Sequence, residues 1–359
     1  MTSRERFSAV LHRQTPDCVP NCDFGYWDET IDAWHDQGLP ADIVTHADVE
    51  EYLGLEGVSR HIGIPCNAGL CPNFTEEIIE EKGTHLIKRD FEGNLVEVPT
   101  TGASIPKYIK YGIETREDWE LYKSEHLDPD HPDRVGDIDA AVRRADDEQL
   151  PLFFFAGSLY GWLRNWMGVE NFSIALLTEK EWVEEMMDHL MNLTLTMIDR
   201  HLQDGVDHAL WWEDMCYNHG PLCSPALFEE LMVPRYRTIT DALKAQGIDV
   251  NILDCDGKIY ELVPGWLRGG INCMFPIEAA HTDPKVLRDT YGEELLLVGG
   301  VDKVQLAKGK DAIDRELEKL RPLVERGGYI PTVDHRIPPD VSYDNYLYYI
   351  EKKKDILAL

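Results

Sequence analysis

The sequence predicts an α/β fold, a (β/α)8 barrel in which a single domain spans residues 1–359. Segments with the character of strands and helices alternate six times with short connections from about residue 136 onward, a pattern typical of a parallel sheet. With 359 residues, of which 43% are hydrophobic, the chain is long enough to close that sheet into a barrel. Acidic residues follow six of the predicted strands, as expected at the face of a barrel that carries a site.

The N-terminal third departs from this regular alternation. A helical segment at residues 2–13 opens the chain, with a capping hydroxyl at its start. The stretch "CVPNCDFGYW" predicts a first strand at about residues 18–24, and residues 28–60 are expected to be helical in pieces. Alternating apolar residues around "EGN" predict a β-hairpin at about residues 84–100, which we interpret as an insertion into the barrel.

Six later strands are predicted from continuous apolar runs, which suit strands that are buried on both faces. In chain order the runs are "LPLFFFAG", "DHALWWED", "DVNILDCDG", "INCMFPIE", "ELLLVGGVD" and "YIPTVDH". The stretches between them have the length and periodicity of helices. We therefore expect a helix on the outside of the barrel to join each strand to the next.

The formal net charge of −31 and the eight cysteines limit the classes of partner and compartment. So negative a surface repels nucleic acid and anionic membranes, and we expect neither as a partner. No cysteine pair has C-x-x-C spacing, which favours free thiols in a reducing cytoplasm. The first residues lack the apolar run of a signal peptide, and no stretch is long enough to span a membrane, so a cytoplasmic location is expected.

Polar side chains at the strand ends form the candidate site. They are Asp23, Glu213 and Asp214, Asp254 and Asp256, Glu278, Asp302, and Asp334 with His335. In a barrel these positions converge on one face, where so many carboxylates would repel one another. A bound cation would offset the repulsion, because carboxylate oxygens and imidazole nitrogens are its ligands. Protonation of some carboxyl groups is the alternative, and it would supply acid–base chemistry.

Structural roles compete with functional ones at several of these positions. A single Asp at the end of a strand is often the cap of the next helix, and Asp23 and Asp302 are as easily caps as site residues. Glu213 and Asp214 could likewise cap a helix, or they could pair with Arg235. For these four acids both interpretations stay open.

Two groups favour a functional interpretation. Asp254 and Asp256 lie on one side of an extended segment, and Gly257 after them lets backbone approach closely. His335, beside a carboxylate at a barrel mouth, is unusual for a core histidine. An aromatic group could line the same mouth for a ring-shaped or methylated ligand, or belong to the core: Tyr26, Trp27, Tyr160, Trp162, Trp166 and Trp211.

Several blocks of the sequence resemble the uroporphyrinogen decarboxylase superfamily, which includes corrinoid-linked methyltransferases. "LPLFFFAGSLYGWLRNWMG" is similar to the family's third strand and the loop after it, and "EDMCYNHGPLCSPALFEELMVPRYRTI" to its D…SP…F…P block. "GGVDK" and "GGYIPTVDHRIPPDVSYDNY" resemble its GGID turn and its closing segment. The resemblance extends over most of the chain and implies a (β/α)8 (TIM) barrel with its site at the carboxyl ends of the strands.

Departures from the family pattern bear on the activity that the resemblance implies. "PNCDFGYWDET" holds no arginine where the decarboxylases carry an Arg-rich stretch that grips substrate carboxylates, which disfavours uroporphyrinogen decarboxylase itself. Asp254, Asp256 and His335 stand where thiol-methylating members carry zinc ligands, so the resemblance implies that these three residues bind a divalent metal, with zinc expected. Hard oxygen ligands suit a metal that polarises the oxygen of a methyl ether or similar donor.

The resemblance therefore implies a methyltransferase that passes a methyl group from an O-methyl or similar donor to a corrinoid held by a separate protein. Its candidate catalytic residues are Asp254, His335, Asp23 and Glu213. Its candidate substrate-binding residues are Tyr26, Trp27, Tyr160, Trp162, Asp214 and Glu278. The expected partners are a small-molecule substrate, the corrinoid protein and, as the family suggests, a second copy of the chain.

Two alternatives stay open. A metal-independent decarboxylase or lyase would act on a non-porphyrin carboxylate, with Asp23 or Asp254 as the acid or base. His335 would then hold the substrate's anion, assisted by Arg164 or Arg336, and the carboxyl groups would have raised pKa values. The third class is a binding protein that kept the barrel without its chemistry.

Overall fold

The computed structural model describes residues 1–100, 106–202 and 205–358. In this part of the chain the central element is a parallel sheet of seven strands, and neighbours in the sheet follow one another in the sequence. The sheet order is β1 (Ile62–Gly63), β6 (Leu152–Gly157), β7 (His208–Trp212), β10 (Asn251–Asp254), β11 (Cys273–Ile277), β12 (Leu296–Gly299) and β13 (Tyr329–Ile330). Every adjacent pair is parallel, so the predicted α/β fold with a parallel sheet is confirmed.

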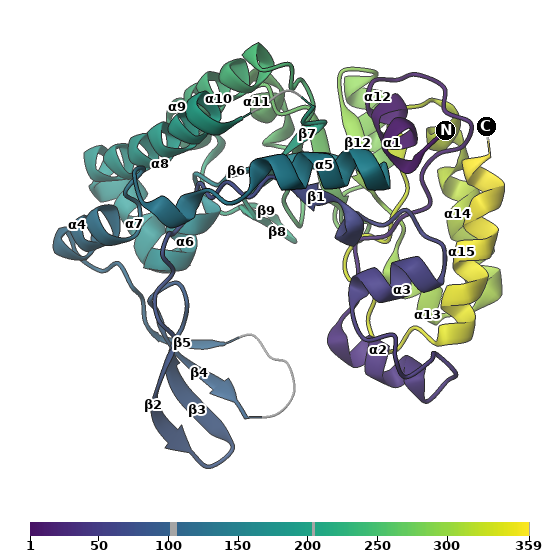
Figure 1. Cartoon of the computed structure of the whole chain (residues 1–359), viewed down its shortest axis with the longest axis horizontal. Helices are drawn as coiled ribbons and strands as arrows, with labels where there is room; N and C mark the ends of the chain where they lie inside the picture. The colour runs from purple at the N-terminus through teal and green to yellow at the C-terminus, as the bar shows by residue number, and fades with distance from the viewer. Residues whose placement is uncertain (101–105, 203–204, 359) are drawn as a thin grey trace.

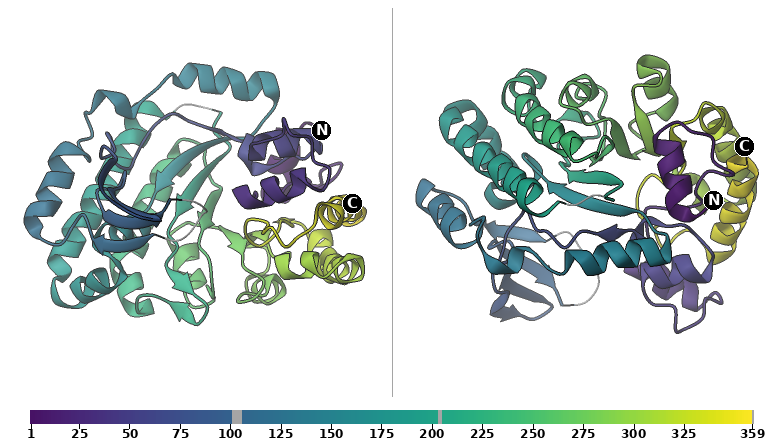
Figure 2. Two further views of the ribbon diagram at one scale, coloured as in Figure 1. Left: turned by 90° about the horizontal axis from the view of Figure 1, so that it is seen from below. Right: turned by 45° about the horizontal axis from the view of Figure 1, so that its top comes forward.

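Helices lie outside this sheet and connect its strands (Figure 1 and Figure 2). The connecting helices are α6 (Gly161–Met167), α7 (Val169–Thr178), α8 (Lys180–His201), α9 (Pro225–Leu231), α10 (Val233–Ala245), α11 (Val263–Arg268), α12 (Pro284–Tyr291), α13 (Lys303–Ala307) and α14 (Lys310–Glu325), with α15 (Tyr343–Leu357) after β13. Local sequence sets where they begin: the Ser224 hydroxyl caps α9, Asp283 caps α12, and proline follows each of these caps.

The N-terminal part is more irregular, as predicted. Its helices are α1 (Ser3–Leu11), α2 (Asp28–His35), α3 (His46–Tyr52), α4 (Arg116–Glu125) and α5 (Ile138–Glu148), with short 3-10 turns at Val58–Arg60 and Pro132–Arg134. Within the described ranges, none of the helices combines the length and the apolar character that crossing a membrane requires. Two short strands, β8 (Cys216–Tyr217) and β9 (Gly220–Pro221), form a separate antiparallel pair after β7.

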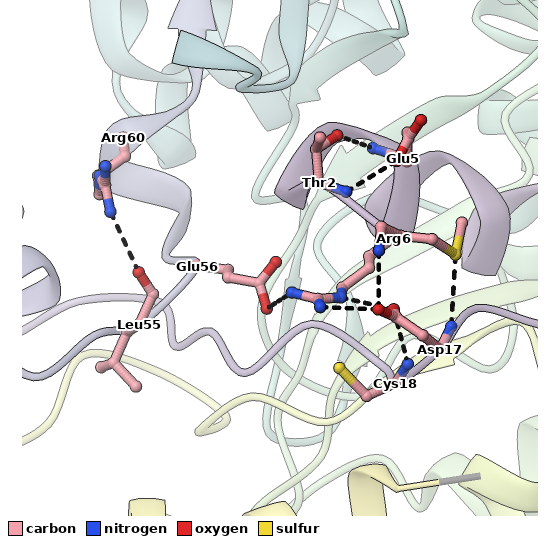
Figure 3. A network of polar contacts seen from close by, with 9 residues as sticks. Thr2, Glu5, Arg6, Asp17, Cys18, Leu55, Glu56 and Arg60 are labelled. Carbon is pink, nitrogen blue, oxygen red and sulfur yellow. Dashed lines mark hydrogen bonds and ion pairs between the residues drawn. The ribbon is translucent and has the colours of Figure 1, made fainter.

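Anchoring of α1 fixes the N-terminal segment against the rest of the chain (Figure 3). Thr2 and Glu5 form a reciprocal capping box at its first turn, which confirms the predicted helix and its cap. Arg6, one turn further on, donates to Asp17 with its Nε at 2.7 Å and to Glu56 with its Nη1 at 3.3 Å. The next residue, Phe7, is buried.

The strand predicted at residues 18–24 is not formed, and this part of the prediction is corrected. No residue of this described segment pairs with the sheet; a parallel bridge between Tyr26 and Ile337 follows two residues further on. Its groups bond elsewhere instead: the N–H of Val19 donates to the carbonyl of Leu357, and the Asp23 carboxylate accepts from the N–H of Val333 at 2.9 Å. Pro20 within the segment has no N–H to offer. The segment is therefore extended beside β13 without a regular ladder.

An antiparallel sheet projects from the body of the molecule, at the lower left of Figure 1. It consists of β2 (Glu77–Lys82), β3 (His85–Arg89), β4 (Leu95–Pro99) and β5 (Lys107–Lys110). The β3–β4 pair is the hairpin predicted at residues 84–100, which is confirmed. The outer strands were not predicted, because β2 ("EIIEEK") is exposed at all six positions and shows no alternation of apolar and polar residues.

Candidate active site

A cavity of about 360 Å³ lies among the parallel strands. Strands β6, β7, β10, β11 and β12 contribute to its wall, and α1, Phe24 and the 46–61 segment contribute the rest. The lining residues are Phe7, Phe24, His46, Val58, Ser59, His61, Phe153, His208, Leu210, Ile252, Asp254, Phe275 and Val298. Most of these side chains are apolar, and among them Asp254 carries the only carboxyl group. The cavity therefore suits an apolar ligand that meets one acid.

Asp254 is the last residue of β10, where its register partner on β7 is Trp212. Its side chain makes no hydrogen bond to another described residue, so its carboxyl group is available to a ligand. Burial raises its pKa well above the ordinary value, and the negative charges of Asp256 and Asp214 raise it further, while Arg336 partly opposes them. These effects favour the neutral carboxylic acid, which can donate a proton.

Asp256 and His335 form a pair, with the Asp256 Oδ2 3.6 Å from the His335 Nε2. Burial, helped by Asp214 and Glu278, raises the pKa of Asp256 to about 7. Burial and the nearby Lys303 lower the pKa of His335. Both shifts favour the neutral forms, so desolvation outweighs the attraction between the two groups. The other carboxylate oxygen of Asp256, Oδ1, is buried without a hydrogen-bond partner in the described residues.

Aromatic rings hold His335 in place. Its imidazole makes an edge contact with Phe24, with 5.3 Å between ring centroids, and stacks on Trp27 at 5.8 Å. The guanidinium of Arg336 lies over the same indole, 5.4 Å from its centroid. Trp27 is 38% exposed, so it stands at the rim. Phe24 also lines the cavity, which connects the His335 side chain to the ligand space.

The predicted metal ligands Asp254, Asp256 and His335 are not assembled into one ligand set. The described part of the chain contains no group of three His, Cys, Asp or Glu side chains arranged to hold a metal ion. Asp254 faces the cavity, whereas Asp256 pairs with His335. Metal dependence therefore stays a prediction from the resemblance, and the arrangement seen here supports proton chemistry more directly.

Glu213 is buried and serves α6 rather than a ligand. Its carboxylate accepts hydrogen bonds from Ser158 Oγ, from Tyr236 Oη, and from the backbone N–H groups of Leu159, Tyr160 and Gly161. It thus caps α6, which precedes β7 in the sequence, and not α9, which follows β7. The alternative partner considered for it, Arg235, instead pairs with Asp188 at 2.7 Å. This geometry does not support the catalytic role predicted for Glu213.

Asp23 is fully buried within a polar network that α15 contributes. Its carboxylate accepts from the Tyr346 and Tyr349 hydroxyls, from the Lys353 ammonium and from the N–H of Val333. The hydroxyl of Tyr26 bonds to Tyr346 at 2.8 Å and is buried in the same network. With their polar atoms occupied in this way, Asp23 and Tyr26 hold the structure together and do not face the cavity.

Asp214 and Glu278 lie near the site but bond to the protein. Asp214 has a positive φ of 43° and pairs with Arg164 at 2.9 Å. Glu278 accepts from the N–H of Gly257 at 2.9 Å and lies 3.8 Å from His281. Both influence Asp256 through their charge. Their placement supports a role in tuning the acids of the site.

The remaining strand-end residues divide between core and caps. Tyr160, Trp166 and Trp211 are buried in the core, and Trp162 stacks on Trp166 with 6.0 Å between ring centroids. None of these four lines the cavity. Asp302 caps α13, which confirms the structural interpretation of this residue as a helix cap. Asp334, the neighbour of His335, accepts from Lys303 and from Ala279. All eight cysteines are free, as expected, and Cys255 is buried.

Sequence reasoning missed two histidines of the cavity wall, His61 and His208. His208 begins β7 and His61 immediately precedes β1, so both stand at the opposite end of the strands from Asp254. The available signal was His208 at the head of the apolar run "HALWW", in alternation with Leu210, which lines the same cavity. Both histidines lie at the amino ends of their strands, whereas the candidate site was expected at the carboxyl ends.

Comparison with known proteins agrees with this architecture. Residues 93–355 match the sequence profile of the family "Uroporphyrinogen decarboxylase (URO-D)". A uroporphyrinogen decarboxylase from Granulibacter bethesdensis is 23% identical over 163 residues, which are 45% of this chain and 46% of that protein, so the matched stretch spans about half the length of this curated relative. A solved methyltransferase from Methanosarcina mazei has a similar fold, with a TM-score of 0.64 and 16% identity over 99% of this chain and 98% of that chain. Because the family profile covers most of the sequence, the chain belongs to the uroporphyrinogen decarboxylase family.

Proposed function

We propose that the protein is a methyltransferase that removes a methyl group from a small neutral donor, an O-methyl ether or similar, and passes it to a corrinoid carried by a separate protein. The observation that carries the proposal is the apolar cavity with Asp254 as its single acid. An anionic substrate would meet an apolar wall and, near Asp254, the charge of Asp214, both of which disfavour it. The likeness of fold to the Methanosarcina mazei methyltransferase supports the same choice.

In the proposed reaction, Asp254 of this chain donates the proton, and the corrinoid carried by the partner protein is the nucleophile. The carbon–oxygen bond of the donor breaks, and its electron pair stays on the oxygen, which takes the proton of Asp254. The methyl carbon forms its new bond with an electron pair from the acceptor. No cysteine is among the described residues that line the cavity, so the wall offers no thiolate to take the methyl group instead. Asp254 is left as a carboxylate and is reprotonated from the mouth, where Asp256 and His335 lie.

The test is methyl transfer to free cob(I)alamin as the acceptor, followed by the absorbance change on methylation, with a panel of aryl and alkyl methyl ethers. We expect turnover by the wild type and a loss of about 100-fold or more in kcat for Asp254→Asn, because a general acid contributes on that order. Asp283→Asn is the matched control, since it exchanges one capping side chain for another on α12. The proposal fails if no ether is demethylated or if Asp254→Asn retains full activity.

Metal dependence is tested in the same assay. Dialysis against a chelator, followed by addition of zinc, compares rates with and without the ion that the resemblance implies. A rate that falls on dialysis and recovers with zinc would restore the metal to the mechanism and would require Asp254, Asp256 and His335 to rearrange around it. An unchanged rate leaves Asp254 as the acid.

A second candidate function is decarboxylation of a small non-porphyrin carboxylate. The specific observation in its favour is that the pKa values of Asp254 and Asp256 are both raised, since decarboxylation replaces carbon dioxide with a proton that a neutral carboxyl group can deliver. Carbon dioxide release from a panel of small carboxylates, together with no methyl transfer, would favour this function over the first.

A further inference from the structure

Two buried histidines stand at the end of the cavity remote from Asp254. His61 and His208 both line it, with 6.0 Å between their ring centroids. Phe7 of α1 contacts both imidazoles, at 4.7 Å from His61 and 5.2 Å from His208. The Arg6 contacts to Asp17 and Glu56 hold this part of α1 in place. We call His61, His208 and Phe7 the cavity floor.

The polar atoms of the floor have no partner in the protein. The Nε2 of His61 and the Nδ1 of His208 are buried, and neither has a hydrogen bond to a described residue. Burying a polar group without a partner costs free energy, so such atoms usually mark a site for a ligand or a water molecule. Burial lowers the pKa of His61 to about 3, and burial with help from His61 lowers that of His208 well below its ordinary value. Each ring is therefore neutral and offers one donor and one acceptor.

The distance between the two ends of the cavity limits the length of a ligand. Asp254 is in register with Trp212, four residues along β7 from His208, which is a rise of about 13 Å. A hydrogen bond of about 2.8 Å at each end leaves about 7 Å for the ligand. Two oxygen atoms at opposite positions of one benzene ring fit within that length, whereas two oxygen atoms at the far ends of two linked rings do not. The walls suit such a ring, because Phe153 lies beside His208, Phe275 lies beside Asp254, and Phe24 also lines the cavity.

We propose that His61 and His208 bind a hydroxyl group, and that the methyl donor is a single-ring aryl methyl ether whose hydroxyl lies opposite its methoxy group. The methoxy oxygen then lies at Asp254 and the hydroxyl at the cavity floor. A neutral imidazole pair can donate to and accept from one hydroxyl, which a charged pair could not do. This inference rests on the proposed function for the methyl group, while the floor site itself does not depend on it.

The test measures binding, without turnover, of two probes that differ only in the hydroxyl group: 4-methoxyphenol and methoxybenzene. Titration calorimetry on the whole protein should show that 4-methoxyphenol binds roughly tenfold more tightly, as a hydrogen bond to an otherwise unpaired buried group would give. In His208→Phe and in His61→Leu the preference should disappear, because methoxybenzene keeps its affinity and 4-methoxyphenol loses its advantage. His189→Phe, which changes a half-buried histidine outside the cavity, should keep the full preference.

The melting temperature, measured on both variants, separates a lost site from a damaged protein. Replacing an unpaired buried imidazole by an apolar side chain should leave the melting temperature unchanged or raise it, and two different variants guard against one that folds poorly. Equal affinity of the two probes in the wild type, as would follow if a buried water alone satisfies the rings, overturns the inference. So does a preference that persists in both variants, or an absence of binding by either probe.

The outcome is distinguishable from that of the proposed function. Hydroxyl-dependent binding without demethylation upholds the floor site and rejects methyl transfer. Demethylation at equal rates with and without the hydroxyl upholds methyl transfer and rejects the floor site.

Discussion

The carboxyl groups of Asp254 and Asp256 share one cause for their raised pKa, which is burial, and differ in what surrounds them. Asp254 faces an apolar cavity and has no hydrogen bond to a described residue, whereas Asp256 lies at the mouth next to His335. The first is placed to donate a proton to a ligand, and the second to exchange protons with solvent. Such a division between two neighbouring acids is common at active sites.

The raised pKa of Asp256 predicts how stability changes with pH. Its pKa of about 7 in the folded protein exceeds the ordinary value, so its contribution to folding is present below about pH 4 and is lost as pH rises through 7. We therefore expect the stability of Asp256→Asn relative to the wild type to rise between pH 4.5 and pH 8, by about 1 kcal/mol once solvent screening of this partly exposed side chain is allowed for. Urea unfolding at both pH values checks this, with Asp302→Asn as the control. A gain that is equal at both pH values would contradict it.

Part of the candidate site could be predicted from single residues. Asp254 and His335 were expected at a common mouth and lie near the cavity, because a residue at the end of a barrel strand must face that end. Glu213 and Asp23 stand at equivalent positions in sequence but turn to backbone N–H groups and hydroxyls from distant segments. Which direction such a carboxylate takes depends on tertiary neighbours. His61 and His208 were missed because they stand at the other end of the strands, where no site was expected.

At the scale of elements, α15 holds in place the segment at residues 18–24, which was predicted to be a strand of the barrel. It supplies Tyr346, Tyr349 and Lys353 to the Asp23 carboxylate, and thus holds the extended segment that precedes α2 beside the end of the sheet. The Lys353 ammonium also donates to the Cys22 carbonyl at 2.6 Å. Side chains from one helix therefore replace part of a ladder of backbone hydrogen bonds.

Removal of Lys353 should show the strength of this arrangement. Breaking a buried ion pair leaves an uncompensated charge and typically costs 3–5 kcal/mol; since Asp23 keeps three other donors, we expect about 3 kcal/mol for Lys353→Met. Lys352→Met is the matched control one residue earlier, where the exposed pair with Asp355 should contribute far less than the buried pair. Chemical denaturation of both variants gives the comparison. Similar losses in the two would show that α15 is not held by this pair.

The elements that the sequence predicted best are those with the strongest local pattern. The sequences that form β6, β10 and β12 are continuous apolar runs, because both faces of each strand are covered. Their apolar composition therefore indicates burial directly. The segment at residues 18–24 has a similar composition, but its pairing is decided by Asp23 and α15, which lie more than 300 residues apart in sequence. Strand β2 is exposed on both faces, so its sequence has no alternation of apolar and polar residues from which a strand could be predicted.

At the scale of the whole molecule, the net charge of −31 acts on stability and on encounters. Acidic side chains outnumber the basic ones by 66 to 35, so many carboxylates have no cation to pair with. Mutual repulsion of this kind destabilises a compact state and is weakened by salt. We therefore expect a protein partner to bind this negatively charged surface through a positively charged face.

Salt should consequently stabilise the protein near neutral pH. Raising sodium chloride from about 20 mM to about 500 mM shortens the Debye length several-fold, and we expect a rise of about 2 °C or more in the melting temperature at pH 7.5. At pH 4.7, close to the calculated isoelectric point, the same addition should have little effect because the net charge is near zero. Scanning calorimetry at both pH values distinguishes charge screening from a general effect of salt, which would act equally at both.

The stacking of Trp27 on His335 gives the rim an optical reporter. Indole fluorescence is quenched by a nearby protonated imidazole and shifts in colour when solvent leaves the ring. Trp27 is exposed and Trp162 and Trp212 are half-buried, whereas Trp34, Trp119, Trp166, Trp211 and Trp266 are buried and provide a steadier background. Emission from this single indole would thus follow both the charge of His335 and the arrival of a partner over the mouth in real time, with Trp27→Phe marking the signal that belongs to it.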